Sequence, residues 1–146
     1  MSWGSTWIET VPSGRSVQHR DLGTSLENLA DLEQAMGNFG AARLNYEKAL
    51  AIFEESLGRS HTHVARCLYN LANLLRDAGD FDGARFRYER SLQIREEKLG
   101  PQHADVIATL DDFAKSLRME GRIEEAEVLE LRAKEAQKQT QAGSFG

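Results

Sequence analysis

Apolar residues in the middle of the chain recur at the spacing of one helical face. The i, i+3, i+4, i+7 arrangement is followed by Val64, Leu68, Leu71, Ala72 and Leu75. This spacing predicts an amphipathic helix. A second series begins at Phe81 and predicts a longer helix that runs to Leu99. Gly79 is suited to end the first helix in a left-handed conformation, and Asp80 to cap the second. The segment is therefore predicted to form a helical hairpin.

The same pattern occurs three times at a period of 42 residues. Three residue types stay in register with it: Gly37, Gly79 and Gly121; Ala42, Ala84 and Ala126; His19, His61 and His103. Random apolar periodicity would not keep glycine, alanine and histidine in step over three copies. The period predicts stacked hairpins, each burying its apolar face on its neighbour. We place the copies at about residues 19–60, 61–102 and 103–138.

The third copy is more polar than the other two. Glu130 stands where the earlier copies have Tyr46 and Tyr88, and Lys134 replaces a leucine. A terminal repeat needs such polar positions because its outer face meets water. We therefore expect the stack to end near residue 138 and residues 139–146 to form a flexible tail.

Composition narrows the fold class and the partners. The chain is rich in Ala, Leu, Glu and Arg and has only two prolines, which favours an all-α protein. Its net charge of −5 argues against nucleic acid as a main partner. No apolar run is long enough to insert into a membrane. Cys67 is the single cysteine, which predicts a buried apolar role and a reducing compartment, by default the cytoplasm.

Residues of the middle copy stand at a characteristic set of spacings, namely Leu68, Leu71, Ala72, Gly79, Phe81, Ala84, Tyr88, Ser91 and Leu92. This series resembles the tetratricopeptide repeat. The 42-residue period, the long second helix and the junction at residues 99–103 resemble more narrowly the kinesin-light-chain type. The resemblance covers residues 19 to about 138. It implies an α-solenoid, a right-handed superhelical stack of three hairpins.

In that family the first helices line a concave groove that holds extended peptides. Carried over by position, the groove candidates of the first copy are Thr24, Glu27, Asn28, Asp31 and Gln34. Those of the second copy are Arg66, Tyr69, Asn70, Asn73 and Arg76. Those of the third copy are Ala108, Asp111, Asp112, Lys115 and Arg118. An amide side chain offers both a donor and an acceptor, so the asparagines suit a peptide backbone of any sequence.

One departure from the family bears on the partner. Chaperone-binding members hold a C-terminal carboxylate with a clamp of Lys, Asn, Asn, Lys and Arg. The matching positions here are Glu27, Asp31, Asn73, Asp111 and Lys115. Three of the five are acidic and would repel a carboxylate. We therefore expect no chaperone C-terminus, and favour a ligand with basic character near the first copy.

The sequence offers little support for chemistry. Residues one repeat apart lie about 10 Å from each other in stacked helices. The recurring histidines therefore cannot share an ion at ligand distances of about 2 Å, and a structural role at the turn between repeats is favoured. The carboxylates of Glu124, Glu125 and Glu127 suit a helix N-terminus. Phosphate loops and nucleophile motifs are absent. We predict no enzyme activity, no metal and no cofactor.

Two tryptophans, Trp3 and Trp7, precede the first repeat. Residues 1–18 are interpreted either as a flexible leader or a lid on the first copy, or as a docking segment, because buried tryptophan contributes strongly at interfaces.

Two functions follow from these features. The first is a non-enzymatic adaptor that binds a protein or peptide partner through the groove. The alternative is a structural or assembly subunit of a larger complex, held by the repeat edges and the tryptophan segment. Three hairpins are close to the minimum for a stable stack, so self-association also stays open.

Overall fold

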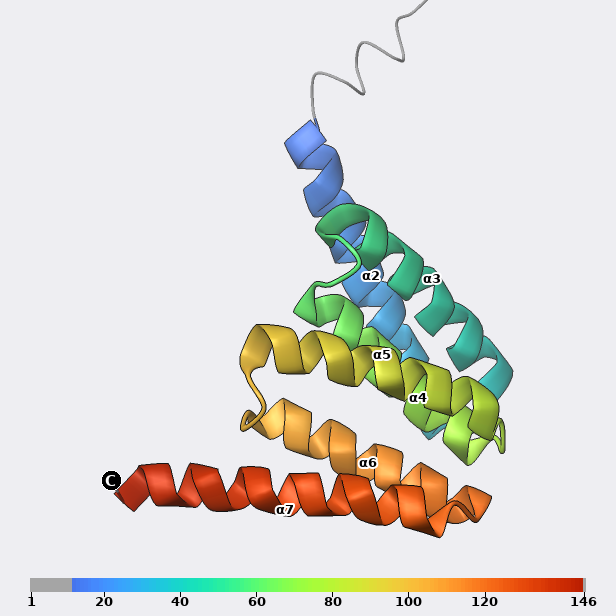
Figure 1. Ribbon diagram of the computed structural model, residues 1–146. Coiled ribbons are helices and arrows are strands. Elements are labelled where there is room, and N and C mark those ends of the chain that lie inside the picture. Colours follow the sequence, from blue (N-terminus) through green and yellow to red (C-terminus); the bar gives the residue numbers. More distant parts are fainter. Residues whose placement is uncertain (1–11, 146) are drawn as a thin grey trace, which may run out of the picture. The chain divides into compact units, whose positions relative to one another are not determined.

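The computed structural model describes residues 12–145, which form helices joined by short turns (Figure 1). Within that range no strand occurs, and the helices pair as the hairpins α2–α3, α4–α5 and α6–α7. The predicted all-α fold of three helical hairpins is confirmed. The chain divides between Arg59 and Ser60 into two compact units. The helices are α2 (Pro12–Ala35) and α3 (Phe39–Leu57) in unit 1, and α4 (Thr62–Asp77), α5 (Phe81–Leu99), α6 (Ala104–Glu120) and α7 (Ile123–Phe145) in unit 2.

In unit 1, α2 packs closely on α3 at Gly23. A Cβ atom added to this glycine would lie 2.9 Å from a ring carbon of Phe53, which is shorter than any ordinary contact. Helix α2 includes residues 12–18, which the sequence assigned to a leader. Pro12 explains the helical start, since the fixed φ of proline suits the first position of a helix. Trp3 and Trp7 lie outside the described residues.

In unit 2, the turn residues act as their types predict. Gly79 ends α4 with φ of 87°, a left-handed value that favours glycine. The Asp80 side chain accepts a hydrogen bond from the Gly83 amide at 3.0 Å and caps α5. Both predictions are confirmed. Across all three copies the period of 42 thus places the hairpin turns correctly.

Two of the three recurring histidines cap helices. Nδ1 of His61 accepts a hydrogen bond from the amide of His63, and Nδ1 of His103 accepts one from the amide of Asp105, each at 3.0 Å. These bonds satisfy backbone donors at the starts of α4 and α6. The predicted structural role at the turn is confirmed for these two residues. It is wrong for His19, because α2 begins before it and contains it.

One core cluster of unit 2 is formed by Leu92 of α5, Val106 and Leu110 of α6, and Ala133 of α7. Helix α6 lies between α5 and α7 and contacts both (Figure 1). Cys67 is completely buried in α4, in agreement with its predicted apolar role. No helix of the described part of the chain is both long enough and apolar enough to cross a membrane.

Helix α7 continues to Phe145, through the residues predicted to form a flexible tail. Residues 139–145 read Gln-Thr-Gln-Ala-Gly-Ser-Phe, of which only the two glutamines and the alanine have high helix propensity. The segment is tied to the α5–α6 turn, because the Gln102 side-chain amide donates to the Gln139 side chain at 2.6 Å. The sequence signal for a tail was polarity alone, and polarity does not distinguish an exposed helix from a coil.

Candidate functional site

The predicted groove residues of unit 1 differ in exposure. Asn28 and Asp31 are exposed on α2, whereas the side chain of Glu27 is only 4% exposed. Asp31 accepts a hydrogen bond from the hydroxyl of Tyr46 on α3, and Gln34 accepts one at 3.2 Å. Part of the predicted surface therefore links the two helices of the hairpin.

In unit 2, the predicted residues of α4 form a half-buried row. Arg66, Tyr69, Asn70 and Asn73 are partly exposed, and Arg76 is only 7% exposed. Arg76 Nε donates to the carboxylate of Asp77 at 3.1 Å. A guanidinium this deeply buried is held by its hydrogen bonds and is poorly placed for direct capture of a ligand.

Asp112 on α6 joins the two first helices of unit 2. It accepts a hydrogen bond from the Tyr69 hydroxyl, and its Oδ1 lies 3.6 Å from Arg76 Nη1. Burial, followed by the bond to Asp112, raises the pKa of the Tyr69 hydroxyl, so it stays protonated as a donor. The structure thus brings together candidates 43 residues apart in the sequence.

Tyr88 of α5 lies beneath this row and was not among the predicted site residues. Its hydroxyl donates to Asn73 Oδ1 and accepts from Arg76 Nη1 at 3.3 Å. The Tyr88 ring stacks on Phe113 with ring centroids 5.3 Å apart. Burial raises the pKa of Tyr88 well above its usual range. The recurrence of tyrosine at this position in the first two copies was the signal that could have identified it.

Arg95 of α5 is the second residue that the sequence reasoning missed. It is only 6% exposed, and its Nη1 donates to Thr109 Oγ1 at 2.8 Å and to the Asp105 carbonyl at 3.3 Å. Its guanidinium carbon lies 4.7 Å from the centroid of the Tyr69 ring, a cation–π contact. Burial lowers the pKa of Arg95. The signal was a charged residue on the apolar face of a predicted helix.

On α6, Asp111, Lys115 and Arg118 are exposed. Arg118 Nε donates to a carboxylate oxygen of Glu130 at 2.7 Å. The pKa of Asp111 is raised, first by burial and then by the negative charges of Asp112 and Glu130. A cation placed beside Asp111 would relieve this repulsion.

Together these residues form a polar surface on the first helices α4 and α6. It contains hydrogen-bond donors and acceptors that are paired within the protein, aromatic rings and carboxylates. Within residues 12–145 no group of three His, Cys, Asp or Glu side chains could hold a metal ion. What the arrangement offers chemically is recognition by hydrogen bonds and charge.

Comparison with known proteins identifies the repeat. The sequence profile of the tetratricopeptide repeat matches residues 21–97, just over half of the chain. The crystal structure of BtubC (BKLC) from P. vanneervenii is similar with a TM-score of 0.77 and 27% identity, over 82% of this chain and 48% of that chain. The resemblance to tetratricopeptide repeats that the sequence indicated is confirmed. Among curated proteins, no match to the chain was found.

Two crystal structures of the nearly identical TPR-like repeats of a putative kinesin light chain from Podosopora anserina are also similar. Their TM-scores are 0.72 and 0.70, at 23% and 24% identity, over 82% of this chain and 57% and 56% of theirs. At this identity they establish the fold alone. The chain spans about half the length of the solved structures it matches.

Proposed function

The chain belongs to the tetratricopeptide repeat family, and we propose that it is a non-enzymatic adaptor that binds a segment of a partner protein along its first helices. Repeats of this family generally mediate protein–protein interactions, through extended surfaces made by successive units.

One observation carries the proposal. Asp112 is bonded to both Tyr69 and Arg76, so α4 and α6 present one continuous, partly exposed polar surface in unit 2. Side chains already held by internal bonds lose little conformational entropy when a partner binds. Such a surface suits an extended segment that needs many modest polar contacts.

The proposed partner segment carries a lysine or arginine that lies beside Asp111. Asp111 is exposed, and the pKa of its carboxyl is raised by burial and by Asp112 and Glu130. A basic side chain would therefore gain a carboxylate whose repulsion it relieves. Asp31 on α2 of unit 1 is likewise exposed and negatively charged. A C-terminal carboxylate meets repulsion at the same residues, so we do not expect chaperone C-termini as ligands.

The test compares two charge reversals on exposed residues. Asp111→Lys changes the proposed surface, and Glu127→Lys makes the same change of charge on α7. Wild type and both variants are used for affinity capture from lysate, with helix content checked by circular dichroism. A partner lost with Asp111→Lys and retained with Glu127→Lys supports the proposal. Partners retained equally by both variants contradict it.

A second candidate function has its own supporting observation. Large apolar side chains are exposed at one repeat position of all three second helices, at Leu44, Phe86 and Val128. Recurring exposed apolar residues are typical of interaction surfaces. They favour a subunit of a larger complex, or self-association, through the second helices. Capture unaffected by Asp111→Lys but lost with Phe86→Ser would support this alternative.

A further inference from the structure

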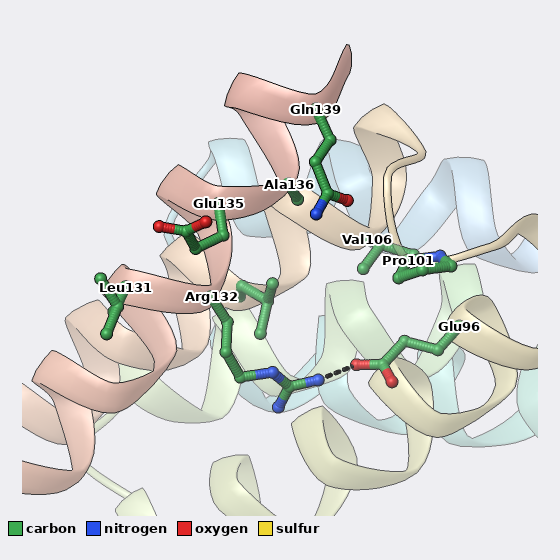
Figure 2. Close-up of a pocket in the computed structure, with 9 residues that line it drawn as sticks. Glu96, Pro101, Val106, Leu131, Arg132, Glu135, Ala136 and Gln139 are labelled. Atoms are coloured by element: carbon green, nitrogen blue, oxygen red, sulfur yellow. Dashed lines mark hydrogen bonds and ion pairs between the residues drawn. The ribbon is translucent and has the colours of Figure 1, made fainter. Parts of the chain in front are cut away.

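A hollow with a volume of about 300 Å³ lies between α5, α6 and α7 of unit 2 (Figure 2). Its size is at the lower end of the range for ligand sites, about 300 to 1,000 Å³. The hollow is lined by the second helices and the start of α6, whereas the surface proposed for the adaptor function is formed by α4 and α6. It therefore calls for a separate explanation.

Two polar ties close the ends of the hollow. Arg132 reaches from α7 to form an ion pair with Glu96 of α5 (Figure 2). Seven residues further along α7, Gln139 accepts the hydrogen bond of Gln102, and the hydroxyl of Thr140 lies 3.2 Å from the Gln102 carbonyl oxygen. Seven helical residues span about 10 Å. The hollow lies between these two ties, and its volume of about 300 Å³ leaves room for one or two side chains.

The floor of the hollow is apolar. It is made by Val106 and Leu110, which are almost fully buried members of the core cluster, and by Ala136. Pro101 and Leu131 add apolar walls, and Leu131 is 60% exposed. An exposed leucine at the edge of an apolar hollow gains most when an apolar group covers it.

The charges at the rim indicate which kind of ligand would fit the hollow. Arg132 is already engaged with Glu96, whereas Glu135 has no ion-pair partner among the residues that the structure describes. The lining therefore presents one uncompensated negative charge. An acidic or strongly polar ligand would meet repulsion at Glu135 and no hydrogen-bond donor on the apolar floor.

We propose that this hollow is a second binding site, for a partner peptide that inserts an aliphatic side chain between α5 and α7 and places a lysine or arginine beside Glu135. The chain's own segment Trp7-Ile8-Glu9 has a negative glutamate next to its apolar residues, whereas the proposed partner has a positive side chain there. This segment therefore fits the rim less well. The site uses side chains that the adaptor surface leaves aside, so each can fail without the other.

The test uses methyl NMR of the full 146-residue chain with a defined probe. The probe is the acetylated and amidated peptide Lys-Arg-Leu-Leu-Arg-Lys. It should shift the methyl signals of Val106, Leu110, Leu131 and Ala136, and leave that of Ala108 unchanged, because Ala108 belongs to the predicted groove. Replacing both leucines of the probe by serine should weaken binding at least about 30-fold. A probe with Glu in place of Lys and Arg should not bind.

Two protein variants complete the test. Glu135→Lys should weaken binding of the basic probe about three- to ten-fold, while Glu127→Lys on the same helix should change it little. The proposal is overturned if millimolar probe leaves the four methyl signals unchanged, or if Glu135→Lys binds as well as Glu127→Lys. It is also overturned if these signals respond to protein concentration, which indicates a second copy, or to deletion of residues 1–11, which indicates the chain's own segment.

Discussion

In the α4–α5 and α6–α7 hairpins, the two helices contact each other at the same repeat position but through different side chains. In the first, Tyr88 is buried and its hydroxyl bonds to Asn73 and Arg76 of α4. In the second, the equivalent residue is Glu130, which accepts a hydrogen bond from Arg118 of α6 across an open surface. A buried aromatic anchor in one hairpin is thus an exposed ion pair in the other.

This difference separates polar residues that stabilise the hairpin from polar residues that are exposed to a partner. Asn73 and Arg76 are joined to a buried side chain, so changing either disturbs the packing of the hairpin. Asp111, Lys115 and Arg118 at the corresponding level of α6 are exposed and can be changed with little effect on the fold. The last hairpin is therefore the better place to test binding, although the family profile, which matches residues 21–97, ends before it.

A second difference lies at the junctions between hairpins. Arg95 of α5 reaches forward to Thr109 and to the Asp105 carbonyl of α6. The residue one period later is Gln137, which is exposed. Arg95 connects two hairpins, and at the corresponding place on α7 the structure has a surface glutamine.

The largest expected effect comes from the anchor itself. Tyr88→Ala removes a fully buried ring that stacks on Phe113, and should lower the free energy of unfolding by about 3–5 kcal/mol. Glu130→Ala removes an exposed pair and should lower it by less than about 1 kcal/mol. Urea denaturation followed by circular dichroism measures both.

Tyr88→Phe separates the hydroxyl from the ring. It leaves Asn73 and Arg76 without their shared partner and should lower the free energy of unfolding by about 1–3 kcal/mol. Equal losses of unfolding free energy for Tyr88→Ala and Glu130→Ala would mean that the two contacts contribute equally to stability, which would contradict the difference between the two hairpins.

An intermediate effect is expected at the junction. Arg95→Ala removes the charged hydrogen bond to Thr109 and the cation–π contact with Tyr69, and should lower the free energy of unfolding by about 2–3 kcal/mol. Gln137→Ala serves as the matched change on α7 and should be nearly neutral. A loss of cooperativity in the Arg95→Ala transition would indicate that the two hairpins unfold separately. An unchanged midpoint would show that Arg95 does not hold them together.

The smallest effect is expected at Asp111, where a substitution should raise the free energy of unfolding rather than lower it. The pKa of this carboxyl is raised in the folded state, so its ionised form opposes folding once the pH exceeds that pKa. Asp111→Asn should therefore raise the free energy of unfolding at pH 7 by less than about 1 kcal/mol. Below the ordinary aspartate pKa of about 3.9 the carboxyl is protonated in both states, and the gain should disappear. Thermal melts at pH 7 and pH 3 measure the difference, and a loss of stability at pH 7 would contradict it.

The helices and their turns followed from local sequence. Apolar spacing identified α4, Gly79 and Asp80 identified the turn after it, and the period extended the hairpin to the other two copies. The two ends were predicted less well. Residues 12–18 and 139–145 are helical although both segments contain glycine and serine and neither carries the apolar stripe by which helices are recognised. Pro12 suits the start of α2, and Gln139 and Thr140 of α7 are hydrogen-bonded to Gln102.

The candidate surface could be predicted from the sequence only in outline. Position in the repeat selected Tyr69, Asn73 and Arg76, but gave no sign that Arg76 is nearly buried or that Tyr69 bonds to Asp112. Arg95 was missed because its helix was assigned from the apolar positions around it. A family pattern states which face a residue occupies, whereas its exposure depends on the side chains opposite.

The sequence alone determined the helical hairpin, its turns and its threefold repetition, because each depends on interactions within about four residues or on a spacing that can be counted. The tertiary structure alone decided which polar groups meet across hairpins, such as Tyr69 with Asp112 and Arg95 with Thr109, and where α7 leaves a hollow over Val106 and Leu110. Those contacts depend on the separation and rotation of whole helices, and the summed packing of many side chains sets both.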